Sequence, residues 1–226
     1  MKISVIIPVL NEAKSIAQVL DAIPKDRVNE IIVVDNGSSD PSPVLARARG
    51  AKVVHELRRG YGRACLTALH TLDHADIVVF LDGDYSDFPE ELPSLVDPLI
   101  RGEADFVIGS RLLGQREKDS IRSHVLWRNR AACALIQALY RKRFTDIGPF
   151  RAIRRSTLES LGMSELSFGW HIEMQLKAAK KNVKTLEVPV RYRVRLGESK
   201  LSGNFRGSFA ATVRTFWTIF RHRLSP

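Results

Sequence analysis

Strand-like segments recur along the first half of the chain, and a segment with helical spacing follows each of them. The strand-like segments are rich in Val, Ile and Phe and cover residues 3–7, 30–35, 52–55, 77–81 and 106–110. A strict alternation of strand and helix is typical of a parallel sheet whose two faces are covered by helices. Strands in such a sheet are buried on both sides and read as continuous apolar runs. The sequence therefore predicts an α/β fold with a Rossmann-like, mostly parallel central sheet.

The size and composition of the chain suit one globular domain. Its 226 residues are 44% hydrophobic and 27% charged, which excludes a disordered protein. Cys65 and Cys133 show neither zinc-site nor disulfide spacing, so we expect reduced core thiols in a cytoplasmic protein. The first residues follow a strand pattern rather than that of a signal peptide. No run of 18 apolar residues occurs, so we expect no segment to span a membrane.

Polar residues follow the first two predicted strands, at the edge where ligands of open α/β sheets bind. Asn11 and Glu12 come after the first strand, and Asp35 ends the second. An acid at this position can accept hydrogen bonds from a base or a ribose. The first turn lacks the GxGxxG fingerprint, which argues against a dinucleotide-dependent dehydrogenase. The alternative roles are structural, with Asn11 as a helix cap and Asp35 as a cap or turn residue.

The third strand leads into the sequence RRGYGRA, residues 58–64. Glycines at a strand-to-helix turn let backbone N–H groups and a helix N-terminus face an anion, and arginines add positive charge. We therefore expect this turn to face an anionic ligand.

Two carboxylates follow the fourth strand with one glycine between them, Asp82 and Asp84. Gly83 allows the backbone to turn so that both side chains face one point. Mg²⁺ and Mn²⁺ commonly take one or two carboxylates and complete their shell with substrate phosphate oxygens and water. The pair thus predicts a metal–diphosphate site. The alternative is a solvated Asp-Gly-Asp turn.

The alternation of strand and helix changes after Arg111. Residues 112–130 are rich in Arg, Ser and Gly and predict a mobile loop before an apolar helix over residues 131–140. A turn and short strand are expected over residues 146–153, a helix from Trp170, and a last strand over residues 185–190.

The chain carries a net charge of +10, and its cations gather in the second half. Such a surface needs an anionic partner, whether nucleic acid, phosphorylated ligand or lipid headgroup. Arg191, Arg193 and Arg195 alternate, so on an extended segment they would face one side together. The alternative is an exposed edge of like charges.

The last segment, residues 205–226, has the composition of an amphipathic helix that lies on an anionic membrane. The alternative is a helix that docks on the core or on a second subunit. One face carries Phe205, Phe209, Val213, Phe216, Trp217 and Phe220, and the helix also bears Arg206, Arg214, Arg221 and Arg223.

Seven motifs, in order along nearly the whole chain, together resemble glycosyltransferase family 2, and most closely the polyprenyl-phosphate (dolichol-phosphate) mannosyl- and glucosyltransferases. The resemblance implies a GT-A fold, a nucleotide-diphospho-sugar donor, Mg²⁺ or Mn²⁺ on Asp82 and Asp84, and inversion at the anomeric carbon. The motifs are PVLNE (8–12), VVDNGSSD (33–40), RRGYGRA (58–64), FLDGDYSDFPE (80–90), VIGSR (107–111), DIGPFRAIRR (146–155) and GESKLSGN (197–204).

The matching motifs also imply roles for individual residues. Arg111 and a second arginine, Arg128 or Arg130, would hold the acceptor phosphate. Where the family often has DADLQ, this chain has DGDYS, so Ser86 or a water would replace the glutamine at the metal. Residues implied to line the nucleotide pocket are Pro8, Asn11, Glu12, Asp35, Gly60, Arg63 and Asp82. Those implied on the acceptor side are Arg111, Arg151, Ser199 and Lys200.

The nature of the acceptor decides whether a base is needed. A lipid phosphate is already ionised, whereas a hydroxyl must lose its proton to a carboxylate, for which the sequence offers Asp84, Asp146 and Glu173. The favoured acceptor is a polyprenyl phosphate at the cytoplasmic face of a membrane, and the alternative is a hydroxyl of a saccharide or another soluble molecule. The transmembrane helices that some relatives append are not seen in this sequence.

We expect a GT-A domain over residues 1–204, with a nucleotide-sugar half (1–111) and an acceptor half (112–204), followed by the C-terminal helix. Two other classes fit less well. A nucleotidyltransferase would carry a glycine-rich basic loop where PVLNE stands. A nucleic-acid-binding module would show a helix-turn-helix, zinc or aromatic stacking motif, so no nucleic acid partner is expected.

Overall fold

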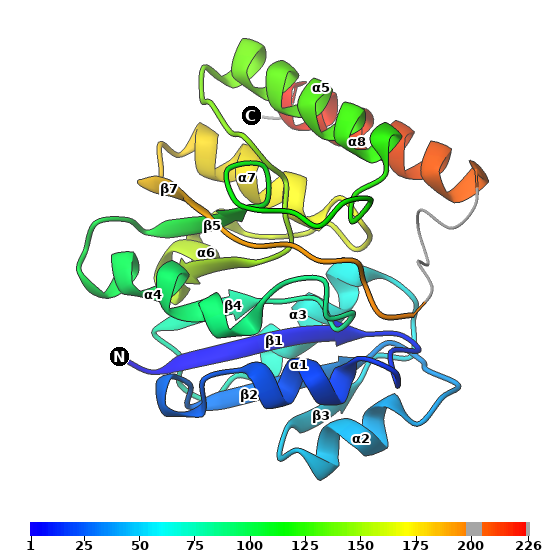
Figure 1. Ribbon diagram of the computed structural model, residues 1–226. Helices are drawn as coiled ribbons and strands as arrows, with labels where there is room; N and C mark the ends of the chain where they lie inside the picture. The colour runs from blue at the N-terminus through cyan, green and yellow to red at the C-terminus, as the bar shows by residue number, and fades with distance from the viewer. Residues whose placement is uncertain (198–204, 225–226) are drawn as a thin grey trace.

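A computed structural model describes residues 1–197 and 205–224, and the strands of this part form one seven-stranded sheet in the order β3-β2-β1-β4-β6-β5-β7 (Figure 1). Only β6 runs antiparallel to its neighbours in this sheet. This confirms the expected mostly parallel α/β fold. The strands are β1 (Ile3–Val9), β2 (Glu30–Asp35), β3 (Lys52–His55), β4 (Ile77–Phe80), β5 (Phe106–Ser110), β6 (Arg151–Arg154) and β7 (Thr185–Pro189).

Helices cover both faces of the sheet and bury two hydrophobic cores. Alternate residues of β1 show the division, since Val5 and Ile7 enter one core and Ile6 the other. The first core is completed by α1 (Ile16–Ala22), α2 (Ser42–Ala48) and α4 (Leu92–Ile100). The second is completed by α3 (Tyr61–Thr71), α5 (Ser123–Tyr140), α6 (Arg155–Leu161), α7 (Trp170–Lys180) and α8 (Phe205–Leu224). Short 3₁₀ turns form at η1 (Lys25–Arg27), after α1, and at η2 (Pro89–Glu91), before α4.

Strand order reverses at β1, which lies between β2 and β4. In an open α/β sheet, ligands bind outside the carboxyl ends of the strands at such a switch point. Asp35 ends β2, and Asn11, Glu12 and Asp82 follow the carboxyl ends of β1 and β4 at this edge. Because β6 runs the other way, its first residue, Arg151, lies opposite Phe80 at the same edge.

Helix α5 begins earlier than the sequence indicates. The expected loop over residues 112–130 is wrong from Ser123 onward, because the helix runs from Ser123 to Tyr140. Asn129, Ala132, Cys133 and Ile136 are buried at helical spacing. Ser123, His124 and Arg130 are exposed, so their loop-like composition is compatible with a helix, whereas Arg128 is partly buried.

Helix α8 docks against α5 and α7, as the alternative for this segment anticipated (Figure 1). Thr218 and Ile219 are buried, and the Tyr140 hydroxyl donates to the Ile219 carbonyl at 2.9 Å. Val213, Trp217 and Phe220 nevertheless stay 52%, 48% and 51% exposed. No helix in the described part of the chain is long and apolar enough to cross a bilayer. The side chains of Phe205, Arg206, Phe209, Arg214 and Arg223 lie outside the described residues.

Candidate functional site

The turn after β4 is held closely against the ends of β1 and α1. The Ser15 hydroxyl donates to the Gly83 carbonyl at 2.8 Å. A Cβ at Gly83 would lie only 3.0 Å from Cγ2 of Val9. The glycine therefore allows the turn to pass over β1, with a carboxylate on either side of it.

The two carboxylates of this turn have different partners. Asp82 Oδ1 accepts a hydrogen bond from the Tyr61 hydroxyl at 2.9 Å. Asp84 Oδ1 accepts from the backbone N–H and the hydroxyl of Ser86, at 2.9 and 2.6 Å. Burial, together with the charge of Asp84, raises the pKa of Asp82 to about 7. A cation beside Asp82 would favour its ionised form, so the pair suits a bound cation, and Ser86 orients Asp84.

A cation of the protein already lies against the second carboxylate. Arg195 Nη1 is 3.2 Å from Asp84 Oδ2, and its Nη2 donates to Glu12 Oε1 at 2.8 Å. The Leu196 N–H donates to the Asp84 carbonyl at 3.0 Å, which fixes the backbone beside the pair. Glu12 and Asp84 therefore share one guanidinium, so a site for positive charge exists between them.

The three alternating arginines 191, 193 and 195, here named the arginine strap, face one side together. Arg191 pairs with Glu91, and Arg193 lies 3.8 and 3.6 Å above the ring centres of Tyr85 and Phe88. The strap follows β7 and runs beside residues 84–91, where the Arg193 N–H donates to the Ser86 carbonyl at 2.9 Å. The alternative of an exposed edge of like charges is wrong for these residues, because each arginine has a partner on the neighbouring segment.

Loop polar groups organise the ends of β1 and β2. Asn11 adopts a left-handed conformation (φ 53°), and its Oδ1 accepts from the Ser39 N–H at 2.7 Å. It is not the cap of α1, which begins at Ile16. Asp35 accepts from the Ser38 N–H at 2.9 Å and from His55 Nδ1 at 3.1 Å. Burial opposes ionisation of Asp35, but these hydrogen bonds hold its pKa below the usual value.

The glycine turn at the start of α3 serves packing rather than anion binding. The Gly62 N–H donates to the Ser167 carbonyl at 3.2 Å, and the Arg63 N–H to that of Leu166 at 3.1 Å. The Gly60 N–H donates to Asn36 Oδ1 at 2.8 Å. A Cβ at Gly62 would lie 1.9 Å from the Glu165 carbonyl oxygen. The expectation that these N–H groups face an anion is therefore wrong, because the protein itself uses them.

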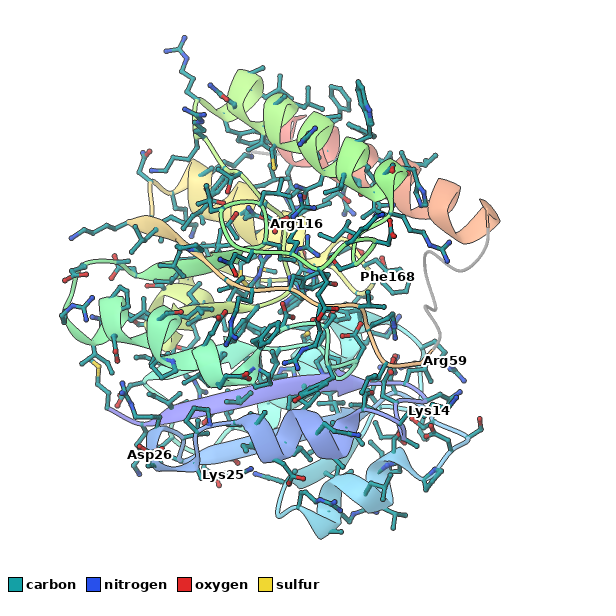
Figure 2. All side chains as sticks on the ribbon, viewed as in Figure 1. Lys14, Lys25, Asp26, Arg59, Arg116 and Phe168 are labelled. Carbon is teal, nitrogen blue, oxygen red and sulfur yellow. The ribbon has the colours of Figure 1, made fainter. Side chains whose placement is uncertain are left out.

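A cavity of about 220 Å³ opens beside Asp82. Its wall includes Arg111, whose Nε and Nη2 each donate to Asp146 at 2.7 Å, and the Tyr192 ring lies 5.0 Å from its guanidinium. Phe168, labelled in Figure 2, lines the same cavity. The remaining polar lining is Tyr61, Arg128, Asn129, His171, Tyr192 and Thr215.

Arg128 lines the same cavity as Arg111. Burial, and then the charge of Arg111, lowers the pKa of Arg128. Within residues 1–197 and 205–224, no acidic side chain pairs with it. Arg130, two positions along α5, is exposed and does not line the cavity. The structure thus brings Arg128 to Arg111, and the two guanidiniums together suit an anionic ligand.

The three candidate bases are all engaged. Asp146 is fully buried beneath Arg111, whose charge keeps the pKa of this carboxyl low despite burial. Glu173 accepts from Ser164 and Glu165 and pairs with Lys177, outside the cavity lining. Asp84 is held by Ser86 and Arg195 as described above.

Other predicted and unpredicted residues lie as follows. Arg151 is fully buried and donates to the carbonyls of Gly148 and His171. Ser199 and Lys200 lie outside the described residues.

Asp87 is 2% exposed, and neither carboxylate oxygen finds a hydrogen-bond partner in the described part of the chain. Burial, and then Asp82, raises its pKa well above the usual value. The third acid of DGDYSD was visible in the sequence, but its burial was not.

The chain resembles known proteins over its full length. The profile of Glycosyl transferase family 2 matches residues 4–162. An uncharacterized glycosyltransferase of Mycobacterium tuberculosis is 35% identical, over 96% of this chain and 97% of that protein. The undecaprenyl-phosphate mannosyltransferase of Micrococcus luteus is 31% identical, over 97% of this chain and 95% of its own length.

Solved structures show the same fold. Glucosyl-3-phosphoglycerate synthase from Mycobacterium tuberculosis, in complex with Mn²⁺, UDP and glucosyl-3-phosphoglycerate, superposes with a TM-score of 0.78. The two proteins are 26% identical, and the match covers 100% of this chain and 81% of the other. The expected GT-A fold is confirmed by this neighbour.

Proposed function

The chain belongs to glycosyl transferase family 2, and we propose that it transfers a sugar from a UDP- or GDP-sugar to a phosphorylated acceptor, with a polyprenyl phosphate favoured. The observation that carries the acceptor class is Arg128, a cavity cation beside Arg111 that has no acidic partner among the described residues. A phosphate on these arginines is already ionised and needs no base. This agrees with the engagement of Asp84, Asp146 and Glu173 in other contacts.

The site fits a divalent cation. Asp84 and Glu12 already hold one positive group, and burial, followed by the charge of Asp84, raises the pKa of Asp82, so a cation there would favour its ionised form. No three acidic, histidine or cysteine side chains converge into a complete metal site within the described ranges. Asp82 and Asp84 would therefore hold Mg²⁺ or Mn²⁺ together with diphosphate oxygens and water. When bound, such an ion offsets the charge of the leaving diphosphate. Mn²⁺ accompanies UDP in the neighbouring structure, which supports this assignment.

The residues of this chain would orient the reaction. Arg111 and Arg128 hold the acceptor phosphate so that one oxygen faces the anomeric carbon. That oxygen forms a bond to the carbon as the bond from the carbon to the diphosphate breaks, and the electron pair leaves with the diphosphate. Attack opposite the leaving group inverts the anomeric configuration.

The nucleoside would lie at the ends of β1 and β2. Asp35, kept anionic by Ser38 and His55, can accept a hydrogen bond from an N–H of the base. We also propose that the chain divides into two halves at residue 111. The cavity receives side chains from both of these halves. The residues proposed to line the nucleoside pocket are Pro8, Asn11, Glu12, Asp35, Gly60 and Arg63.

Exposed apolar side chains on α5 and α8 support a lipid acceptor. Trp127 immediately precedes Arg128 and is 75% exposed, and Val213, Trp217 and Phe220 are half exposed on the adjoining helix. We propose that these side chains contact the inner face of a membrane. Co-sedimentation with anionic vesicles tests the contact, and a protein that stays in the supernatant at low salt would contradict it.

The relatives support two acceptors. The name of the Micrococcus luteus protein specifies undecaprenyl phosphate, whereas the structural neighbour has a soluble product, glucosyl-3-phosphoglycerate. A small soluble phosphorylated molecule is therefore the second candidate acceptor. Both share the anionic group that Arg111 and Arg128 would bind.

The test is sugar transfer from radiolabelled UDP- and GDP-sugars into membrane extract with Mg²⁺ or Mn²⁺, followed by partition between butanol and water. We expect label in the butanol phase that mild acid releases. Label only in a water-soluble product would replace the lipid with a soluble acceptor. No transfer from any donor, with or without added soluble phosphorylated acceptors, would reject the proposed function.

A further inference from the structure

A chain of hydrogen bonds ends on the first carboxylate of the pair. The Tyr61 hydroxyl lies 2.9 Å from Asp82 Oδ1 and 3.1 Å from His171 Nε2. The rings of Tyr61 and His171 meet edge to face, with their centres 4.7 Å apart. The three residues come from the start of α3, the turn after β4 and the start of α7, so the fold alone brings them together.

The chemistry of these groups determines which of them donates each hydrogen bond. A phenol has one proton, and a carboxylate that binds a divalent cation is ionised and only accepts hydrogen bonds, so Tyr61 would donate to Asp82 in the metal-bound protein. The Tyr61 oxygen then accepts from His171 Nε2–H. Burial, and the nearby charges of Arg151 and Arg111, lower the pKa of His171 well below its usual value, so its ring is neutral. With its single proton on Nε2, His171 presents Nδ1 as an acceptor.

Packing of the surrounding residues holds Tyr61 and His171 in place. The first turn of α3 is pressed against residues 165–167 through Gly60 and Gly62, where a Cβ would meet backbone oxygens at 2.3 and 1.9 Å. Trp170, fully buried beside His171, packs edge to face on Phe80 at 5.9 Å, directly under the turn. Tyr61 and His171 therefore have little freedom to reorient.

The position of these three hydrogen-bonded residues indicates which part of the substrate they contact. Asp82, Tyr61 and His171 line the cavity that also contains Arg111 and Arg128. Asp84, which does not line it, faces Glu12 and Arg195 instead. With the diphosphate on the Asp84 side and the acceptor phosphate at the arginines, the group that lies between them is the sugar.

We propose that Tyr61 and His171 determine which sugar the protein transfers. Tyr61 is a positioning residue that fixes one oxygen of Asp82, so the other oxygen has a set direction. The Tyr61 hydroxyl also fixes the ring of His171, whose Nδ1 then presents a fixed acceptor to a hydroxyl group of the sugar, while Asp82 Oδ2 would hold the cation. A site built to accept hydrogen bonds from particular hydroxyls discriminates strongly against donors that lack or invert them. This inference rests on the proposed function.

The test compares donors that share a nucleotide and differ in one sugar hydroxyl, such as UDP-glucose and UDP-galactose, with GDP-mannose and GDP-glucose as the second pair. The variants are Tyr61→Phe, which removes only the hydroxyl, and His171→Gln. Tyr140→Phe is the matched control, since its hydroxyl bonds to the Ile219 carbonyl of α8. We expect the ratio of kcat/KM within a pair to change at least about tenfold in both test variants and less than about twofold in the control.

The ratio separates the proposed role from a structural one. Lost folding or metal binding lowers turnover of both donors equally and leaves the ratio unchanged, and this outcome in a folded Tyr61→Phe and His171→Gln would overturn the inference while the transferase activity stands. If the wild-type protein turns over one epimer too slowly to detect, the detection limit is taken as the upper bound of that rate. We then expect both variants to turn over this epimer faster than that bound. Absence of transfer by wild-type protein would instead reject the proposed function, and this inference with it.

Discussion

Arg195 places Nη1 3.2 Å from Oδ2 of Asp84, so that a guanidinium lies against the carboxylate proposed to bind the metal. The same guanidinium also holds Glu12. A divalent ion at Asp84 must therefore compete with a cation of the protein, and the two cations exclude each other where they share one oxygen. Arg191, another residue of the arginine strap, pairs with Glu91 rather than with a carboxylate proposed to bind the metal.

Replacing Arg195 with Gln is expected to strengthen Mn²⁺ binding in the absence of nucleotide. A partly exposed ion pair contributes up to about 1 kcal/mol, which corresponds to about a fivefold lower Kd once the competitor is removed. Titration calorimetry with Mn²⁺ measures this, and Arg191→Gln serves as the control with the same loss of charge. An unchanged or weaker affinity in Arg195→Gln would show that the guanidinium does not compete.

Replacing Arg128 with Gln is expected to lower kcat/KM for the acceptor by roughly 10²-fold, because one arm of the phosphate clamp is lost. Arg130→Gln removes the same charge from the exposed face of α5 and should change it less than about twofold. Initial rates at varied acceptor concentration distinguish the two. Equal losses in both variants would mean that α5 contributes only general positive charge.

Asp87 gives a prediction about pH and stability. Its folded-state pKa is raised by burial, so above the ordinary pKa of an aspartate the unfolded chain ionises while the folded protein keeps the proton. This difference lowers the free energy of unfolding increasingly as pH rises toward the folded-state pKa.

The neutral isostere Asp87→Asn lacks this penalty, so its stability relative to wild type should improve between about pH 4 and pH 7. Urea unfolding at both pH values measures the trend. A difference between the two proteins that stays constant with pH would mean that Asp87 ionises normally in the folded state.

Local pattern predicted those parts of the structure that depend on local sequence. The parallel strands of the first half were visible as apolar runs, and Asp82 and Asp84 as neighbours after one of them. The antiparallel β6 between β4 and β5 was not, because a four-residue strand does not specify its partners.

Contacts between distant residues could not be predicted. Tyr61 and His171 are 110 positions apart, and Glu12 and Arg195 are 183 apart. Each pair forms only when the whole sheet has assembled. The choice between Arg128 and Arg130 likewise depended on the phase of α5, which its loop-like composition concealed.

The most direct test of the metal–diphosphate assignment is sugar transfer by Asp84→Asn in the presence of Mn²⁺. The substitution keeps the shape of the side chain and removes the charge that a divalent ion needs. We predict a fall in kcat of roughly 10²- to 10³-fold, as is typical for loss of one preorganised electrostatic partner, with the thermal unfolding midpoint close to that of wild type. Near-normal turnover in a folded Asp84→Asn variant would contradict the account, because catalysis would then not depend on this carboxylate.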